Sequence, residues 1–323
     1  MLYTGFDIGG TKCAVCLGEK DEKGMRIVDK AAFLTPGTWR EAMEEMLSAA
    51  KKLLRGKTPD ACGFSCGGPL DWKRGVVMCP PNLPAWDNVP VTDMAHEALG
   101  APAFLENDAN ACALAEWHFG AGRGEESMAF FTFGTGLGAG LILDGRLIRG
   151  ATGNAGEAGH IRLRSFGPAG YGKEGSFEGF CSGGGLAQLA DTLGRRAAQR
   201  GKKPAWLDGP LDAKHVAQTS RDGDETALEV FRLCGAMLGE GLAVVADICD
   251  PGLIVIGSIF TRCRDLLEGS MWESLRREAL PGISGTLRVE SAMLGEEIGD
   301  WAALGVAEYG LERGNQNGAG RVR

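Results

Sequence analysis

The sequence predicts an α/β protein of two lobes, each built on one copy of a repeated strand, glycine turn and strand. The chain has 323 residues, which is more than one hydrophobic core usually serves and which suits two domains. Phe6-Asp7-Ile8-Gly9 has the same layout as Phe131-Thr132-Phe133-Gly134. An apolar run precedes the glycines in each copy and another follows, which indicates an internal duplication with one copy in each lobe.

Alternating apolar runs and glycine turns predict the elements of the first lobe. Strands are expected at residues 2–8, 12–17 and 25–34. A helix at 39–55 begins at the capping box of Thr38 and Glu41 and ends at Gly56. The sequence then predicts a strand at 61–65, a proline-rich loop at 80–86, a helix at 93–99, a strand at 103–106 and a helix at 109–119.

The second half repeats the opening pattern and then becomes mainly helical. The glycine-rich stretch 150–185 predicts a long loop, and long loops inside compact domains are usually functional. The other predicted elements are strands at 129–133, 138–143 and 146–148, a helix at 226–248, a strand at 253–256, a helix at 264–279, a strand at 287–289 and a helix at 298–309.

The predicted domain organisation follows from this order of elements. The N-terminal lobe is expected at residues 1–112, with the C-terminal helix 298–313 packing back on it. The C-terminal lobe is expected at 113–297, and the polar, glycine-rich end at 314–323 is expected to be a flexible tail.

Composition excludes several classes of function. The net charge of −8 leaves no basic surplus for binding nucleic acid. No apolar run approaches the roughly 20 residues that span a membrane, and no signal peptide precedes the first strand. The 10 cysteines are scattered, and Cys13 and Cys16 point to opposite faces of one predicted strand, so we expect reduced core thiols. The sequence therefore predicts a cytoplasmic protein without a nucleic-acid or membrane partner.

The glycine turns allow three interpretations. Residues 134–139 fit the dinucleotide fingerprint, but that motif needs a following helix and a strand is predicted instead. Residues 167–173 fit the spacing of a phosphate loop, but Glu174 stands where Ser or Thr would bind Mg²⁺. The third interpretation covers both copies: two hairpin turns direct backbone N–H groups at a phosphate chain, with Thr11 and Thr135 adding hydroxyl donors. For either turn by itself, an ordinary tight hairpin is the alternative.

Four motifs together resemble those of the ROK family (repressors, open reading frames and sugar kinases). They are Phe6-Asp7-Ile8-Gly9-Gly10-Thr11-Lys12, Glu106-Asn107-Asp108-Ala109-Asn110, Gly134-Thr135-Gly136-Leu137-Gly138-Ala139-Gly140 and Asn154-Ala155-Gly156-Glu157-Ala158-Gly159-His160. The resemblance implies a two-lobed actin-like ATPase (ribonuclease H-like) fold of duplicated βββαβα-type lobes with a cleft between them. It also implies transfer of the γ-phosphate of ATP to a hexose. The DNA-binding domain of the family's repressors is not expected, because the first motif lies so near the start.

The resemblance also implies the roles of single residues. Asp108 matches the catalytic base, although the residue pattern by itself fits a helix N-cap equally well. Asp7 matches a residue that holds Mg²⁺ through water. The implied sugar ligands are Asn107, Glu157, His160, Glu178, Gly68 and Asn82, with Gly67 and Trp86 beside them. Trp86 fits a core position equally well. The implied ATP-binding residues are Asp7, Gly9, Gly10, Thr11, Lys12, Gly134, Thr135, Gly136 and Gly257.

The chain departs from the family pattern at two places. Many members have a zinc-binding cysteine segment, but its three Cys positions are here Ala169, Tyr171 and Ser176, so no zinc is expected. Gly257-Ser258 replaces a frequent Gly-Gly pair near the adenine, which leaves the phosphoryl donor open.

The leading hypothesis is a homodimeric kinase that uses ATP and Mg²⁺ to phosphorylate a glucose-like aldohexose at its 6-hydroxyl. Fructose, mannose, allose and N-acetylhexosamines remain alternative substrates. A catalytically silent sugar-binding regulator and an actin-like ATPase that acts on a protein partner are the rival classes. The sugar-ligand set disfavours the ATPase, because such an enzyme does not need it.

Overall fold

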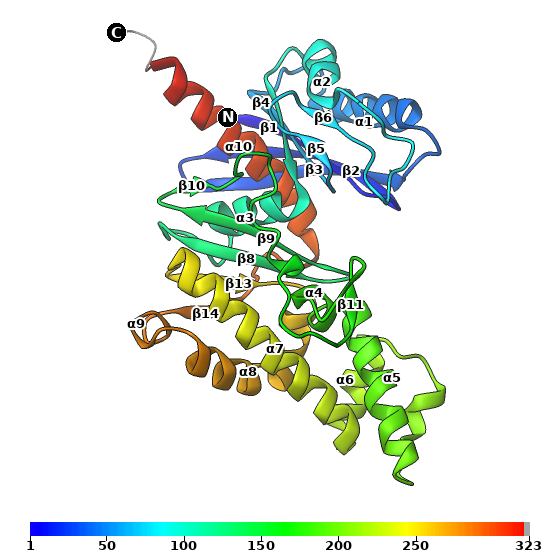
Figure 1. The fold of residues 1–323 in the computed structure, drawn as a ribbon. Coiled ribbons are helices and arrows are strands. Elements are labelled where there is room, and N and C mark those ends of the chain that lie inside the picture. Colours follow the sequence, from blue (N-terminus) through cyan, green and yellow to red (C-terminus); the bar gives the residue numbers. More distant parts are fainter. Residues whose placement is uncertain (320–323) are drawn as a thin grey trace. The chain divides into compact units, whose positions relative to one another are not determined.

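A computed structural model describes the backbone of residues 1–319 and the side chains of residues 1–314. The chain divides into two compact units, drawn together in Figure 1. Unit 1 comprises Met1–Gly124, Arg149–Gly153 and the chain from Met293 onward, and unit 2 comprises Glu125–Ile148 and Asn154–Ala292. The expected boundary at 112/113 falls inside helix α3 (Asp108–Phe119). The whole helix belongs to unit 1 because it packs on α10 of that unit.

Unit 1 is built on a five-stranded mixed sheet with the order β3-β2-β1-β4-β7. Pairing is antiparallel from β3 to β1 and parallel from β1 to β7. Besides α3, its elements are β1 (Leu2–Ile8), β2 (Lys12–Asp21), β3 (Gly24–Leu34), α1 (Trp39–Leu54), β4 (Ala61–Cys66), β5 (Leu70–Asp71), β6 (Val76–Val77), α2 (Val91–Leu99), β7 (Ala103–Asn107) and α10 (Ile298–Ala319), with a 3₁₀ turn at Gly295–Glu297.

The central strand β1 serves both faces of this sheet, because successive side chains of a strand point to opposite sides. Phe6 and Ile8 belong to the core formed with α1 and α2. Tyr3 packs instead with residues of α10, which crosses the other face (Figure 1). Asp7 also points toward α10, since a Cβ added to Gly299 would lie 2.6 Å from its Oδ2. The alternation therefore places one acidic side chain under a helix.

Unit 2 repeats the architecture with the order β10-β9-β8-β13-β14. Pairing is again antiparallel over the first three strands and parallel over the last three, which confirms the predicted duplication. Its elements are β8 (Met128–Phe133), β9 (Leu137–Leu143), β10 (Arg146–Leu147), η1 (Ala158–His160), β11 (Ala169–Gly170), β12 (Lys173–Glu174), α4 (Phe177–Phe180), α5 (Gly183–Gln199), η2 (Ala205–Asp208), α6 (Ala213–Arg221), α7 (Glu225–Cys249), β13 (Leu253–Ile256), α8 (Ile259–Glu278), α9 (Pro281–Ser284) and β14 (Arg288–Ser291).

The core of unit 2 lies between its sheet and its helices. Phe131 of β8 packs against Phe177 of α4, with ring centroids 6.0 Å apart. Helices α7 and α8 run side by side (Figure 1). Their backbones approach closely at Gly239, where an added Cβ would lie 2.1 Å from the Met271 carbonyl oxygen. Glycine is therefore required at this helix crossing.

The stretch 150–185, predicted as loop, contains the short elements η1, β11, β12 and α4 and the beginning of α5. Side chains form hydrogen bonds to the backbone of this stretch. The Gln188 amide of α5 donates to and accepts from the backbone of Ala169, both at 2.9 Å. Lys173 Nζ donates to the His160 carbonyl at 2.6 Å. Hydrogen bonds between residues 13 and 19 positions apart thus order a segment that was predicted to be an irregular loop.

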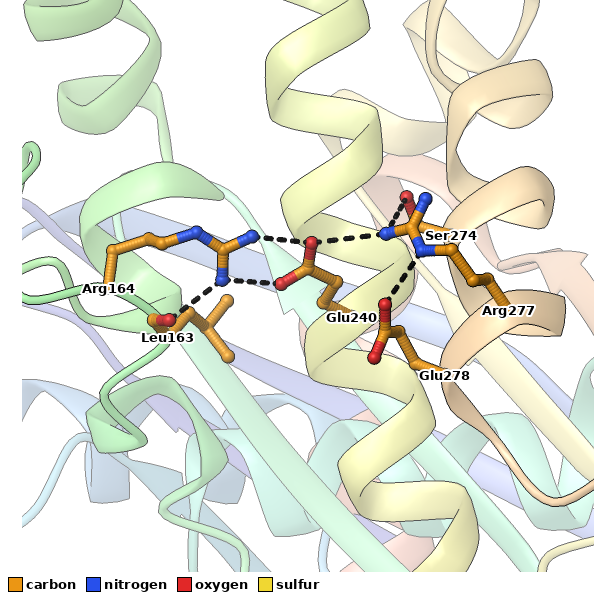
Figure 2. Close-up of polar contacts among 6 residues, drawn as sticks. All are labelled: Leu163, Arg164, Glu240, Ser274, Arg277 and Glu278. Carbon is orange, nitrogen blue, oxygen red and sulfur yellow. Dashed lines mark hydrogen bonds and ion pairs between the residues drawn. The ribbon is translucent and has the colours of Figure 1, made fainter.

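An ion-pair network ties the same segment to two long helices (Figure 2). Both terminal nitrogens of the Arg164 guanidinium, Nη1 and Nη2, contact the carboxylate of Glu240 in α7 at 2.6 Å. Glu240 also pairs with Arg277 of α8 at 3.4 Å. The Glu240 side chain is only 13% exposed, but Arg164 and Arg277 are 46% and 54% exposed, so this network is shielded from solvent screening only in part, at Glu240.

The C-terminal end of the chain differs from the expected tail. Helix α10 continues through residues 314–319, which were expected to be a tail, because a helix already formed propagates at little cost. Residues 320–323, the rest of that expected tail, lie outside the described residues. Trp86 fitted a sugar contact and a core position equally well in the sequence, and it is 2% exposed within the core of unit 1. Within residues 1–319, no helix is both long and apolar enough to cross a membrane.

Candidate active site

The corner between β7 and α3 holds the two central residues of the predicted site. Asn107 is the N-cap of α3, and its Oδ1 accepts a hydrogen bond from Ala109 N–H at 3.0 Å. Asp108 is the first helical residue, and its Oδ1 accepts from the same N–H at 2.8 Å. Capping is therefore the role of Asn107, and the alternative reading of Asp108 as the N-cap is wrong.

Three neighbouring strands end at this corner. In the register of the sheet, Ile8 of β1 pairs with Cys66 of β4, and Cys66 pairs with Asn107 of β7. The carboxyl ends of these parallel strands therefore lie at one edge of the sheet. Ligands of open α/β sheets bind outside such strand ends.

Glycines after β4 leave room in front of the corner. A Cβ added to Gly67 would lie 3.6 Å from Asn82 Oδ1 and 3.9 Å from Asp108 Oδ2. A Cβ added to Gly68 would lie 3.5 Å from Asn107 Nδ2. The structure thus brings the predicted residues Gly68, Asn82, Asn107 and Asp108 together.

The first glycine turn lies beside them. Gly9 N–H closes the turn on the Lys12 carbonyl at 3.1 Å. Thr11 and Lys12 are exposed, and a Cβ on Gly10 would lie 2.7 Å from the Asn82 carbonyl oxygen. The turn is therefore open to solvent on one side and packed against the proline-rich loop on the other.

Asp7 carries the clearest electrostatic signal of unit 1. Its pKa is raised to about 6, mainly by burial and also by the carboxylates of Asp300 and Asp108, while Lys12 opposes the shift. Asp300 was not predicted as a site residue. It lies on α10, 293 positions along the chain from Asp7, and its ion pair with Lys30 at 3.2 Å gives no local sequence signal.

The pKa of Asp108 is also raised. Burial is the main cause, while the Ala109 N–H and the Asn107 side chain oppose the shift. A carboxylate with a raised pKa is a stronger proton acceptor than one with an ordinary pKa. The same corner thus combines an oriented carboxylate with increased basicity.

Unit 2 gathers a second group around its own glycine turn. Glu178 Oε2 accepts from Leu137 N–H at 3.0 Å, and a Cβ on Gly136 would lie 2.7 Å from that oxygen. A Cβ on Gly159 would lie 3.4 Å from the Glu178 Cβ. Glu178, expected as a sugar ligand, therefore also anchors the glycine turn that contains Thr135.

Glu157 precedes the short helix η1, and His160 is its last residue. His160 N–H donates to the Glu157 carbonyl at 3.1 Å. The His160 ring is edge-on to Tyr171, with centroids 6.5 Å apart. Tyr171 is 79% exposed and adopts a positive φ of 45°, which is unusual for a residue other than glycine.

The end of β13 meets the same turn of unit 2. Gly183 N–H donates to the Gly134 carbonyl at 2.8 Å. A Cβ on Gly134 would lie 3.5 Å from Ser258 Oγ, and Ser258 follows Gly257 with a φ of 61°. The structure thus brings Gly134 and Gly257 together and adds Gly183 and Ser258, which were not predicted to bind ATP.

Comparison with known proteins assigns the class. The duplicated mixed sheet, with a glycine turn between the first two strands of each copy, defines an actin-like ATPase fold. The chain belongs to the ROK family, whose model matches residues 3–307. The crystal structure of a ROK hexokinase from Thermus thermophilus is similar with a TM-score of 0.81 and 33% identity, over 97% of this chain and 100% of that one.

Two glucokinases are also similar to this chain. The glucokinase of Thermotoga maritima is 31% identical over 311 residues, which is 96% of this chain and 97% of that protein. A ROK family glucokinase from Streptomyces griseus, crystallised with glucose and AMPPNP, has a TM-score of 0.72 and 32% identity over 96% of this chain and 100% of that one.

Proposed function

We propose that this chain is an ATP-dependent sugar kinase that phosphorylates the 6-hydroxyl of a glucose-like aldohexose. The placement of Asp108 carries the proposal. Its carboxylate faces Gly67 and lies among the amides of Asn82 and Asn107, which can hydrogen-bond to sugar hydroxyls. A sugar hydroxyl is a poor nucleophile, and a carboxylate within hydrogen-bond reach can take its proton as it attacks.

The orientation of Asp108 supports this role. Ala109 N–H holds Oδ1 at 2.8 Å, while Oδ2 faces the space in front of Gly67. One oxygen is thus fixed and the other is available to the hydroxyl proton. General base catalysis of this kind contributes roughly 10²- to 10⁴-fold to the rate.

The glycine turns and Asp7 fit a bound nucleotide with Mg²⁺. Repulsion from Asp300 and Asp108 makes a cation beside Asp7 favourable. No cluster of three or more metal-binding side chains occurs within residues 1–314. A single carboxylate such as that of Asp7 can hold Mg²⁺ through water, with phosphate oxygens of the nucleotide as further ligands. When bound, Mg²⁺ neutralises charge on the transferring phosphoryl group.

The sugar-binding roles of Glu157, His160 and Glu178 remain part of the proposal. Carboxylates and imidazole read sugar hydroxyls through directional hydrogen bonds. Glu178 can bind both Leu137 N–H and a hydroxyl, because a carboxylate accepts at two oxygens. Glucose is favoured because two of the similar proteins are glucokinases.

A sugar panel tests the proposal. ADP release is measured with glucose, mannose, fructose, allose and N-acetylated hexosamines, and the product is identified by ³¹P NMR. We expect the highest kcat/KM for glucose and a 6-phosphate product. Activity on fructose alone would overturn glucose as the proposed substrate but would still support a sugar kinase.

The rival is a catalytically silent sugar-binding regulator. Calorimetry that detects sugar binding, in a preparation that releases no ADP with any hexose, would favour it. Retention of Asp7, Asp108 and both glycine turns favours the enzyme, because a regulator that only binds sugar does not need them.

A further inference from the structure

Arg149 has no part in the proposed chemistry, yet its surroundings are specific. The segment Arg149–Gly153 belongs to unit 1, although the chain on both sides of it belongs to unit 2. The guanidinium carbon lies 4.3 Å from the ring centroid of Trp72 and 5.4 Å from that of Tyr309. Cations over aromatic faces are attracted by the ring quadrupole, and more strongly when shielded from water.

The partner of Arg149 is Glu106, at the end of β7. Glu106 is 3% exposed, and its Oε1 accepts a hydrogen bond from Arg149 Nε and pairs with Nη2. Burial raises the pKa of Glu106, and Arg149 opposes this rise. A buried carboxylate that loses its cation is strongly destabilised. Arg149 therefore favours the ionised form of Glu106 and holds its carboxylate in place.

Glu106 in turn spans the catalytic corner. Its Oε2 accepts from Asn110 Nδ2 at 3.4 Å, and Asn110 lies in the first turn of α3. Asn107 and Asp108 stand between these two residues in the chain. One side chain thus bridges the strand end and the helix start that present the proposed base.

We infer that Arg149 is a positioning residue of the proposed kinase reaction: it holds Glu106, and through Glu106 and Asn110 it fixes the backbone corner that carries Asn107 and Asp108. The inference rests on the proposed function for its effect on rate. The effect on the corner itself can be measured without turnover.

Arg149→Met is the main variant, because methionine keeps an unbranched apolar chain beside Trp72 and removes the charge. We expect kcat on glucose to fall by about 100-fold, the loss that a displacement of about 1 Å brings. KM for ATP should change less than about 3-fold, because the glycine turns are untouched. Hydrogen exchange of the Ala109 amide, which both Asn107 and Asp108 hold, should become at least about 10-fold faster.

A second substitution tests whether Arg149 acts through Glu106. Glu106→Gln combined with Arg149→Met removes the buried charge. Asn110 Oδ1 is buried without a hydrogen-bond partner among the described residues, so the new amide can donate to it. The double variant should regain at least about 10-fold in kcat and the slow exchange of Ala109. Equal kcat in the single and double variants would overturn the inference.

Lys73→Met is the matched control. Its ammonium lies 5.5 Å from the same Trp72 ring, but it is exposed and makes no pair with Glu106. It should leave kcat and Ala109 exchange unchanged. If Arg149→Met unfolds, Arg149→Lys keeps the charge without the planar fork and should show a smaller loss in the same direction.

The two proposals fail in different ways. Absence of sugar phosphorylation by the wild type would contradict the kinase, whereas unchanged Ala109 exchange in Arg149→Met would contradict the positioning role. A variant that loses thermal stability but keeps wild-type kcat would also show that Arg149 is merely structural.

Discussion

The ionised side chain of Asp7 lowers the folding stability of the protein, although the proposed reaction needs its charge. Its pKa in the folded state is about 6, whereas an aspartate in an unfolded chain titrates near 3.9. The folded state therefore binds this proton more tightly. The stability that the protonated Asp7 side chain contributes is present below about pH 4 and is lost as the pH rises through about 6. Above that pH, ionised Asp7 costs about 3 kcal/mol of folding stability.

Asp7→Asn should accordingly stabilise the protein at pH 8 by up to about 3 kcal/mol while lowering kcat. The gain should nearly vanish at about pH 3, where Asp7 is largely protonated in both states. Chemical denaturation at both pH values, without nucleotide and Mg²⁺, measures it. Asp87→Asn, at an exposed site of the same unit, is the control. A gain of equal size at both pH values would contradict the assignment.

For single residues, the sequence predicted which residues belong to the candidate site better than it predicted which other residues surround them. Asn107, Asp108 and Asn82 come together as expected, because strand ends and turns define local geometry. Asp300 and Arg149 could not be predicted, since each reaches the site through packing of a segment distant in sequence.

Among the elements, the segment 160–176 differs most from expectation. It lies in the glycine-rich stretch 150–185, which was predicted to be an irregular loop, and Gly167, Gly172 and Gly175 adopt positive φ. The short strands β11 and β12 and the hydrogen bonds of the Gln188 side chain to the Ala169 backbone order the segment instead. Amide pairing of this kind has no periodicity, so hydrophobic patterns do not reveal it. The regular strands and most helices were predictable because their apolar residues follow periods of 2 and 3.6.

Gln188→Leu should loosen this segment. The variant loses its bonds to Ala169 and to the Gly184 carbonyl, so we expect faster proteolysis within 160–176 and a stability loss of about 1 kcal/mol. KM for sugar should rise more than kcat falls, because His160 and Glu178 flank the segment. Gln218→Leu, which removes one exposed bond to Asp222, is the control. Unchanged KM and proteolysis would contradict a role in sugar binding.

For the whole molecule, the duplicated sheet was predictable from two matching motifs, and the distribution of segments between the units was not. Arg149–Gly153 joins unit 1 through contacts of Arg149 with Trp72 and Tyr309. Such contacts depend on tertiary packing and leave no pattern in the sequence.

Metal dependence is also a property of the whole molecule. Ala169, Tyr171 and Ser176 cannot supply thiolates, so we expect no stoichiometric zinc. After treatment with a chelator and dialysis, Mg²⁺ alone should restore full activity, and elemental analysis should find no zinc. Activity that returns only with added zinc would contradict this expectation.

Asp108→Asn tests the central claim most directly, by kcat and sugar Kd measured on one folded preparation. Asparagine keeps the size of the side chain and an acceptor for Ala109 N–H, and Asn107 still caps α3. The base is lost, so kcat should fall by roughly 10²- to 10⁴-fold while sugar Kd changes little. An unchanged melting temperature would show that the fold is intact. Near-wild-type kcat in this variant would remove Asp108 from the mechanism and contradict the proposed kinase chemistry.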